Sequence, residues 1–306
     1  MNIIKQFKAL SDPTRLRLLN ILNRFELNVN EIVSIVDMIQ SGVSRHLKIL
    51  LEAGLLKSRK DGSFIYYSAN GTDATRELIT LACTQVKEDP VFVRDQLRAE
   101  QSITLRKNRT KRFFRTVAPQ WDRLKREVLG TFDLNGLFET RVRDRKRIAD
   151  LGCGTGEMLS RLTRADSHTL IGVDASPEML EQARIKLHGP ENIELRLGEV
   201  ENLPMRDLEV DAAIMSMVLY HLVAPEKSIQ EVFRVLRPGG LFLLADFQRH
   251  DREEVKQLIG GAWLGFEKEQ VLGWFSASGL TPVSHDVFPV EKGLSITFYA
   301  AQKELI

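Results

Sequence analysis

The sequence has few of the features that mark secreted, membrane or metal-thiolate proteins. Its 306 residues include only two cysteines, Cys83 and Cys153, which supply neither a disulfide framework nor a thiolate metal cluster. The N-terminal segment lacks the apolar core of a signal peptide, and no apolar run approaches the length of a membrane span. We therefore expect a cytoplasmic protein with no membrane segment.

Basic and acidic residues are nearly balanced over the whole chain. The formal net charge is +2, with 27% charged and 43% hydrophobic residues, as in ordinary globular proteins, and the length suffices for two domain cores. The exception is the segment from Arg98 to Arg126, which has ten basic residues and two acidic ones. We predict two domains, residues 1–90 and 112–306, joined by a basic helical connector at residues 91–111.

The first seventy residues show short helical patterns followed by two extended runs. Ser11 or Asp12 can cap a helix whose first turn contains Pro13. Two further helical patterns follow, and the segment LKSRKDGSFIYYSA places its extended runs around Asp61-Gly62, a pair typical of hairpin turns. This order of elements predicts an α+β winged helix-turn-helix.

Two segments, FKALSDPTRLRLLNIL and SGVSRHLKILLEAGLLKSRKDGSFIYYSA, resemble the ArsR family of winged-helix repressors over about residues 3–85. The resemblance implies a homodimer that binds double-stranded operator DNA at two half-sites about one helical turn apart. The apolar face of the recognition helix directs polar residues outward, and basic hairpin residues suit backbone phosphates. The alternative is a solvated basic face without DNA. The predicted DNA-binding residues are Gln40, Ser41, Ser44, Arg45, Lys48, Lys57, Arg59 and Lys60.

The metal ligands of many ArsR proteins are missing from this sequence. Arsenic-sensing members have paired cysteines before the recognition helix, where this chain reads FELNVNEIV, with Asn28 and Asn30. The final helical segment, residues 72–89, contains no histidine, and Cys83 alone cannot coordinate a soft metal. We therefore expect no metal effector.

The rest of the chain alternates extended and helical patterns. The extended runs RIADLG, TLIGVDAS, IELRLGE, DAAIMSM and GLFLLADF are followed by helical patterns, whereas PVSHDVF and SITFYAA form a final pair. The alternation predicts an α/β fold with a doubly wound parallel sheet and an antiparallel edge. Ligands of such sheets bind at the carboxyl ends of the strands.

A glycine-rich turn follows the first of these strands. In IADLGCGTGEMLSRL, Gly152, Gly154 and Gly156 allow a ligand to approach the backbone N–H groups. Asp150 precedes the turn, and Asp174 ends the second strand, where a carboxylate can accept hydrogen bonds from ribose hydroxyls. Because NAD and FAD sites share Gly-x-Gly, a site for another nucleotide cofactor is the alternative.

Four successive motifs, DLGCGTGEML, GVDASPEML, GEVENLP and EVFRVLRPGGLFLLADF, resemble those of class I S-adenosylmethionine-dependent methyltransferases. The resemblance covers residues 112–306 and implies a Rossmann-like domain that binds S-adenosylmethionine or S-adenosylhomocysteine. It implies that the glycines border the methionine part, that Asp174 holds the ribose, and that Glu199 and Val200 contact the adenine. The segment FFRTVAPQWDRL resembles the helix that closes over the cofactor. The predicted cofactor residues are Asp150, Gly152, Gly154, Gly156, Asp174, Ala175, Met179, Glu199, Val200, Ser216 and Trp121.

No fixed catalytic residue follows from this family, because a sulfonium is already an activated methyl donor and the protein mainly aligns the reactants. Tyr220, His221, Asp246 and His250 are candidates for a base, with packing or hydrogen bonding as the alternative for each. We expect a DNA-binding transcriptional regulator whose second domain binds the cofactor and senses methionine-cycle status. The alternative is a small-molecule methyltransferase with a regulatory DNA-binding domain, acting on a methyl acceptor that the sequence does not identify.

Overall fold

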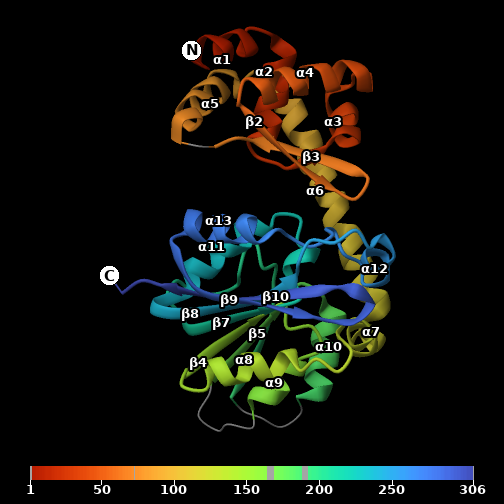
Figure 1. The fold of residues 1–306 in the computed structure, drawn as a ribbon, viewed down its shortest axis with the longest axis vertical. Coiled ribbons are helices and arrows are strands. Elements are labelled where there is room, and N and C mark those ends of the chain that lie inside the picture. Colours follow the sequence, from red (N-terminus) through yellow and green to blue (C-terminus); the bar gives the residue numbers. More distant parts are fainter. Residues whose placement is uncertain (1, 72, 164–168, 188–191, 306) are drawn as a thin grey trace. The chain divides into compact units, whose positions relative to one another are not determined.

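The computed structural model divides the chain into two compact units, Met1–Arg106 and Lys107–Ile306. None of the described helices has the length and apolar character that crossing a membrane requires. The structure describes residues 2–71, 73–163, 169–187 and 192–305 (Figure 1).

The boundary between the units falls inside one continuous helix, α6 (Pro90–Val117). The basic segment predicted as a connector is therefore helical, but it does not stand apart from the two units. Asp95 is fully buried in the first unit and its carboxylate lies 2.6 Å from Nε of Arg17. Phe114, further along the helix, contacts Trp121 in the second unit. Each part of α6 thus belongs to the core or the site of one unit.

The first unit is the winged helix-turn-helix that the sequence predicts. Asp12 caps the second helix by accepting a hydrogen bond from the backbone N–H of Arg15 at 3.0 Å, and Pro13 occupies the first turn. Gly62 turns the hairpin with φ +57°. Before α6, the elements are α1 (Asn2–Leu10), α2 (Pro13–Leu22), β1 (Leu27–Asn28), α3 (Val29–Val36), α4 (Gln40–Glu52), β2 (Leu56–Asp61), β3 (Phe64–Ala69) and α5 (Asp73–Val86).

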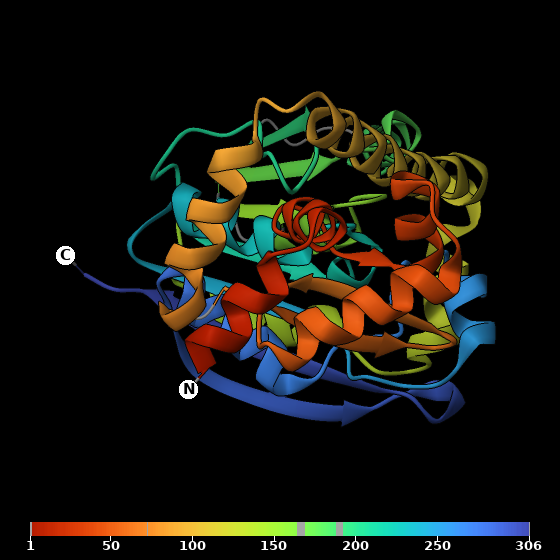
Figure 2. The same cartoon turned by 90° about the horizontal axis from the view of Figure 1, so that it is seen from above.

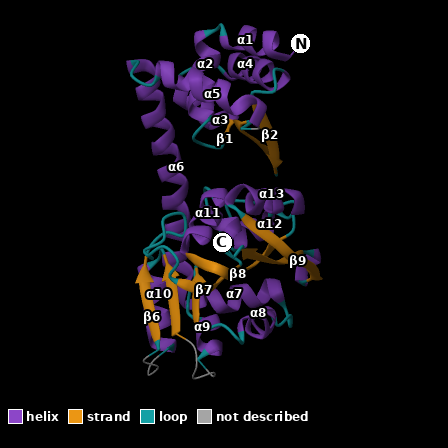
Figure 3. Ribbon diagram, turned by 90° about the vertical axis from the view of Figure 1, so that its left-hand side faces the viewer, coloured by secondary structure: helices purple, strands orange, loops and turns teal. Residues whose placement is uncertain are grey.

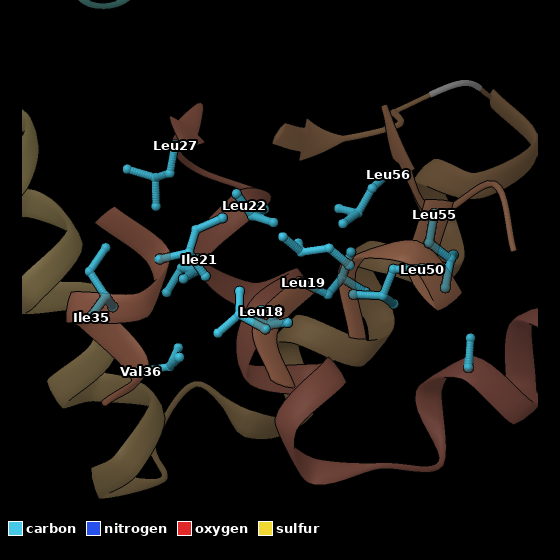
Figure 4. Close-up of a cluster of buried hydrophobic side chains, with 14 of the residues drawn as sticks. Leu18, Leu19, Ile21, Leu22, Leu27, Ile35, Val36, Leu50, Leu55 and Leu56 are labelled. Atoms are coloured by element: carbon cyan, nitrogen blue, oxygen red, sulfur yellow. The ribbon is translucent and has the colours of Figure 1, made fainter. Parts of the chain in front are cut away.

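A leucine-rich core holds these elements together (Figure 4). Leu18, Leu19 and Leu22 of α2 are buried against Leu50 of α4 and Leu56 of β2. Burial of one such side chain contributes roughly 1.5–3 kcal/mol. The helix α4 contacts strand β2 of the β2–β3 hairpin (Figure 2).

The second unit is built on a seven-stranded sheet with the order β6-β5-β4-β7-β8-β10-β9. The first five strands in this order are parallel, and β10 runs antiparallel to both of its neighbours, β8 and β9. This confirms the predicted α/β architecture and its antiparallel edge. The strands are β4 (Arg147–Leu151), β5 (Thr169–Asp174), β6 (Ile193–Leu197), β7 (Val210–Ser216), β8 (Leu236–Phe247), β9 (Leu280–Pro289) and β10 (Ser295–Lys303).

Helices cover both faces of this sheet (Figures 1 and 3). One face carries α8, α9 and α10, and the other carries α11 and α13. The strand order reverses beside β4, which pairs with β5 on one side and β7 on the other, so the carboxyl ends of these strands form the crevice where such sheets bind ligands. The helices are α7 (Trp121–Leu129), α8 (Leu134–Val142), α9 (Glu157–Leu162), α10 (Pro177–Lys186), α11 (Pro225–Val235), α12 (Glu253–Leu258) and α13 (Lys268–Ser278), with the short turns η1 (Ala118–Gln120), η2 (Leu219–His221) and η3 (Glu291–Gly293).

Candidate functional site

An open cavity lies at the carboxyl ends of the parallel strands in the second unit. Its walls come from the segments after β4, β5, β6 and β7 and from the end of α6 and the start of α7. The predicted cofactor residues in its wall are Trp121, Asp150, Gly152, Gly154, Asp174, Ala175, Met179, Glu199, Val200 and Ser216.

The glycine turn after β4 has left-handed backbone angles that only glycine adopts without strain. Gly152 has φ +77°, and a Cβ there would lie 2.5 Å from Cγ2 of Val218. Gly154 has φ +52° and lines the cavity below Trp121. Gly156, predicted to border the ligand, is not in the cavity wall. It precedes α9, and a Cβ there would lie 2.9 Å from Cδ1 of Leu187, so this glycine permits close packing against the end of α10.

Two buried carboxylates flank this turn. Asp174 accepts hydrogen bonds from the backbone N–H of Gly154 at 2.8 Å and of Ser176 at 2.9 Å, but burial still raises its pKa above the ordinary value. Burial raises the pKa of Asp150 to about 7, and the charge of Lys125 acts in the opposite direction. The floor of the cavity is therefore suited to groups that donate hydrogen bonds or carry positive charge.

Two lysines of α6 pair with Glu199 at the cavity wall. Nζ of Lys107 lies 2.7 Å from one carboxylate oxygen, and Nζ of Lys111 lies 2.8 Å from the other. Burial alone would raise the pKa of Glu199, but the two lysines outweigh it and lower the pKa to about 2. Glu201 also lies 3.6 Å from Lys107. Both lysines lie in the segment predicted as a connector, so this contact was not predicted, although the run of basic residues was its signal.

Aromatic rings close another part of the cavity. The ring of Phe114 is 5.2 Å from that of Trp121 and 4.6 Å from that of His221, measured between centroids. Nδ1 of His221 lies 3.1 Å from the carbonyl oxygen of Gly260, and burial lowers the pKa of His221 to about 3. Tyr220 is buried behind this wall, with its ring 3.9 Å from that of His221. Sequence analysis did not single out Phe114, which precedes Trp121 in the motif FFRTVAPQWDRL.

The other candidate bases do not line the cavity. Asp246 is buried and accepts hydrogen bonds from the backbone N–H of Phe247 at 2.8 Å and of Tyr220 at 3.3 Å. Its carboxylate therefore anchors η2, and burial raises its pKa to about 7. His250 lies outside the cavity wall, and its Nδ1 accepts a hydrogen bond from the backbone N–H of Arg252 at 3.1 Å. Among these candidates, only His221 reaches the cavity.

Three buried polar atoms of the cavity wall have no hydrogen-bond partner within the described part of the chain. They are Oδ1 of Asn135, Oγ of Ser216 and Nε2 of His221; a fourth such atom, Oε2 of Glu157, has an ion pair with Lys125 instead. Because buried polar atoms are nearly always paired in folded proteins, each of these atoms is open to a hydrogen bond from a bound water molecule or ligand.

A second candidate site is the exposed face of α4 in the first unit. Gln40, Ser41, Ser44, Arg45 and Lys48 are all exposed on this helix, while Val43, Leu47 and Leu50 of its other face are buried. This is the arrangement that a recognition helix requires, because the side chains that read base edges must be free of the core.

The hairpin differs in part from the prediction. Lys57 and Lys60 are exposed, as expected for phosphate contacts. Arg59 is instead half-buried, with its guanidinium 3.0 Å from the carboxylate of Glu26 and its charge over the ring of Tyr66. The guanidinium thus stabilises the hairpin within its own unit, which a count of basic residues could not reveal.

The described residues contain no group of three or more His, Cys, Asp or Glu placed to hold a metal ion. Cys83 is half-buried, and burial raises its pKa to about 11, while Cys153 is buried in the glycine turn. Burial therefore disfavours the thiolate form of both residues, which is the form that acts as a metal ligand.

Comparisons with known proteins agree with both units. Residues 12–58 match the family model for bacterial regulatory proteins of the arsR family, and residues 149–244 match that for a methyltransferase domain. An uncharacterized methyltransferase of Mycobacterium tuberculosis is 39% identical over 119 residues, which cover 38% of this chain and 47% of that protein. The demethylmenaquinone methyltransferase of Desulfitobacterium hafniense is 35% identical over 126 residues, covering 40% and 49% respectively. The matched segments thus span about half the length of these relatives.

Solved structures support the fold of the second unit. The [4+2]-cyclase SpnF superposes with a TM-score of 0.54 at 16% identity, over 64% of this chain and 95% of that chain. A phosphoethanolamine N-methyltransferase of Haemonchus contortus superposes with a TM-score of 0.50 at 15% identity, over 57% and 53%. The chain therefore combines a helix-turn-helix domain of the ArsR family with a methyltransferase domain of Rossmann-like fold.

Proposed function

We propose that this protein is a DNA-binding transcriptional regulator whose methyltransferase domain binds S-adenosylmethionine or S-adenosylhomocysteine and reports the state of the methionine cycle to the DNA-binding domain. One observation supports this most strongly. A chain with an ArsR-family domain gathers ten residues predicted to bind the cofactor around a single cavity. A regulator needs an effector, and the first unit offers no metal site among its described residues.

The cavity suits an adenosyl amino acid. Both Asp174 and Asp150 line the cavity, where Asp174 would accept hydrogen bonds from the ribose hydroxyls and Asp150 from the ammonium group. The charge of Lys125 on α7, which also pairs with Glu157 at 2.5 Å, suits the carboxylate at the same end. The unpartnered Oγ of Ser216 offers a further hydrogen bond. These residues would bind and orient the cofactor, which supplies an electrophilic methyl group when it is present as the sulfonium.

The pairing of Glu199 with two lysines gives this cavity a means of reporting occupancy. The carboxylate of Glu199 is expected to accept the adenine amino group, but both of its oxygens are bonded to Lys107 and Lys111 in this structure. An adenosyl ligand must share or replace these bonds. Because both lysines belong to α6, which continues into the first unit, ligand binding alters contacts of the helix that joins the domains.

The aromatic residues can distinguish the two forms of the cofactor. S-adenosylmethionine carries a positive charge at sulfur, and S-adenosylhomocysteine does not. Phe114 and Trp121 offer ring faces or edges in the cavity wall, and cation–π attraction favours a sulfonium by roughly 0.5–2 kcal/mol. A ligand shifts an equilibrium only through its different affinities for the two states, so this difference is what a sensor can use.

The test is a titration of DNA binding with both cofactor forms. Duplexes that the full-length protein selects from a random pool serve as operator, and the oligomeric state is measured in the same buffer. We expect a dimer whose operator affinity changes with one cofactor form more than with the other. The Asp174→Ala variant should bind the operator but lose the response. If neither form binds the protein or alters its operator affinity, the sensing function is wrong.

The second candidate is a small-molecule methyltransferase that carries a regulatory DNA-binding domain. The observation that favours it is the unpartnered Nε2 of His221, since a nucleotide sensor needs no extra hydrogen-bond acceptor among its aromatic residues. The two functions are compatible in one chain.

A further inference from the structure

One ring nitrogen of His221 has a hydrogen-bond partner among the described residues, and the other has none. Nδ1 lies 3.1 Å from the carbonyl oxygen of Gly260, and a carbonyl can only accept a hydrogen bond. Nδ1 therefore carries the proton, and Nε2 presents a lone pair. Nε2 is buried and has no partner among the described residues, although the ring lines the cavity.

We propose that Nε2 of His221 forms a second subsite of the cavity, which takes the hydroxyl or uncharged N–H group of a small methyl acceptor. This inference rests on the proposed cofactor binding and extends it, because it assigns the domain a methyl acceptor of defined chemistry. The rings of Phe114 and Trp121 stand beside His221 and form an apolar wall for the body of that molecule.

The chemistry of the subsite selects the acceptor. A lone pair in an apolar wall needs a donor, so a carboxylate or phosphate leaves it unsatisfied and adds a repulsive charge. A protonated amine can donate but has no lone pair to attack a methyl group. A hydroxyl or a neutral amine has both a proton for Nε2 and a lone pair for the methyl group. Thiols are weak donors and fit this position less well.

The same geometry moves the proton. The acceptor's lone pair forms the new bond to the methyl carbon, while the electron pair of the broken carbon–sulfur bond stays on sulfur. The positive charge thereby passes to the acceptor. The proton of a methylated hydroxyl becomes strongly acidic and passes to Nε2 of His221, whereas a methylated amine keeps its proton, hydrogen-bonded to Nε2, until it leaves the site. Burial keeps His221 neutral at physiological pH, so its lone pair is available and does not repel a sulfonium. The imidazolium returns the proton to solvent after the product leaves.

The subsite can be tested without turnover, on the full-length protein saturated with S-adenosylhomocysteine and labelled with ¹⁵N-histidine. The probes are 4-methylphenol and 4-fluorotoluene, which have similar shapes but differ in the O–H donor, and aniline with fluorobenzene as the N–H pair. We expect 4-methylphenol or aniline to shift the Nε2 resonance of His221 as hydrogen bonding does, and the fluorinated partners to leave it unchanged. An Nε2-protonated ring, or equal responses to donor and non-donor, would overturn the proposal.

Calorimetry with variants separates this inference from the proposed function. His221→Phe keeps a ring without nitrogen, His221→Gln restores an acceptor oxygen, and His250→Phe is the matched control outside the cavity. We expect all three to retain S-adenosylhomocysteine binding. Affinity for 4-methylphenol should fall roughly tenfold in His221→Phe, recover in part in His221→Gln, and stay unchanged in the control. Loss of cofactor binding by the normal protein would refute the proposed function, whereas cofactor binding with no donor preference would refute the subsite alone.

Discussion

Replacing Gly152 by alanine tests the local geometry of the cavity through stability. The left-handed backbone at φ +77° costs an alanine about 1–2 kcal/mol. The new Cβ would also lie 2.5 Å and 2.8 Å from the two γ carbons of Val218, and such overpacking costs about 1–3 kcal/mol. We therefore expect Gly152→Ala to lower the free energy of unfolding of the second unit by about 2–5 kcal/mol.

Two variants isolate the contributions. In Gly154→Ala the new Cβ meets only Trp121, at 3.6 Å, so the free energy of unfolding should fall only by the cost of the left-handed backbone, about 1–2 kcal/mol. This variant should also bind S-adenosylhomocysteine more weakly, because its methyl group enters the cavity. Gly152→Ala combined with Val218→Ala removes the overlapping carbons, and the double variant should be about 1–3 kcal/mol more stable than the sum of its single changes.

The assay is urea unfolding followed by tryptophan fluorescence, which reports on the second unit because all three tryptophans lie after residue 106. Gly54→Ala in the first unit is the negative control: it has φ +72° and no neighbour within 4 Å of the new Cβ, and it should leave the transition of the second unit unchanged. Equal losses for Gly152→Ala and Gly154→Ala, or strict additivity of the double variant, would show that the contact with Val218 is not the source of the cost.

The remaining predictions concern DNA, metals and acid. Arg45→Ala should weaken specific operator binding by roughly 1–3 kcal/mol and relax sequence choice, whereas Lys60→Ala should weaken binding to all duplexes alike. If titrations show unchanged specificity in Arg45→Ala, Arg45 is not one of the residues that read the base sequence. Zinc, cadmium or arsenite at low micromolar levels should not release DNA in a band-shift assay, and release would make Cys83 the first suspect. Because the folded-state pKa of Glu199 is lowered from 4.5 to about 2, its ion pairs stabilise the protein above pH 4.5 and lose this effect as the pH falls toward 2. Solvent screening limits this contribution to the free energy of unfolding to about 1 kcal/mol. In urea titrations, a variant with both Lys107→Met and Lys111→Met should lose less stability between pH 5 and pH 3 than the normal protein does. An equal loss of stability would contradict this assignment.

Most of the fold was predictable because its signals are local. Asp12 with Pro13 marked the start of α2, Asp61-Gly62 marked the hairpin, and alternating patterns marked the parallel strands. The position in α6 where one unit ends and the next begins was not predictable. A run of basic residues indicates a solvated helix, but Asp95 in the same helix is fully buried against Arg17, and only tertiary packing decides which charges find partners.

The candidate site was predictable where a motif fixes the backbone and not where side chains from distant segments meet. The turn at Gly152 and Gly154 and the strand end at Asp174 follow from the sequence, and all three line the cavity. Gly156 has the same spacing but serves helix packing, because glycine permits close approach to another helix as well as to a ligand. Phe114 belongs to the motif FFRTVAPQWDRL, but the motif does not show which of its side chains lines the cavity.

Two consecutive residues of α6 have their principal ionic contacts in different units. Arg106 pairs with Glu31, whose carboxylate also caps α3, and its guanidinium lies 5.1 Å from the ring centre of Tyr66 in β3. Lys107 pairs with Glu199 at the cavity wall. Under the proposed function, a ligand that takes over Glu199 would act one peptide bond away from the residue that pairs with the capping carboxylate of α3. Because the two contacts share one helix, this proposed coupling requires no particular arrangement of the two units.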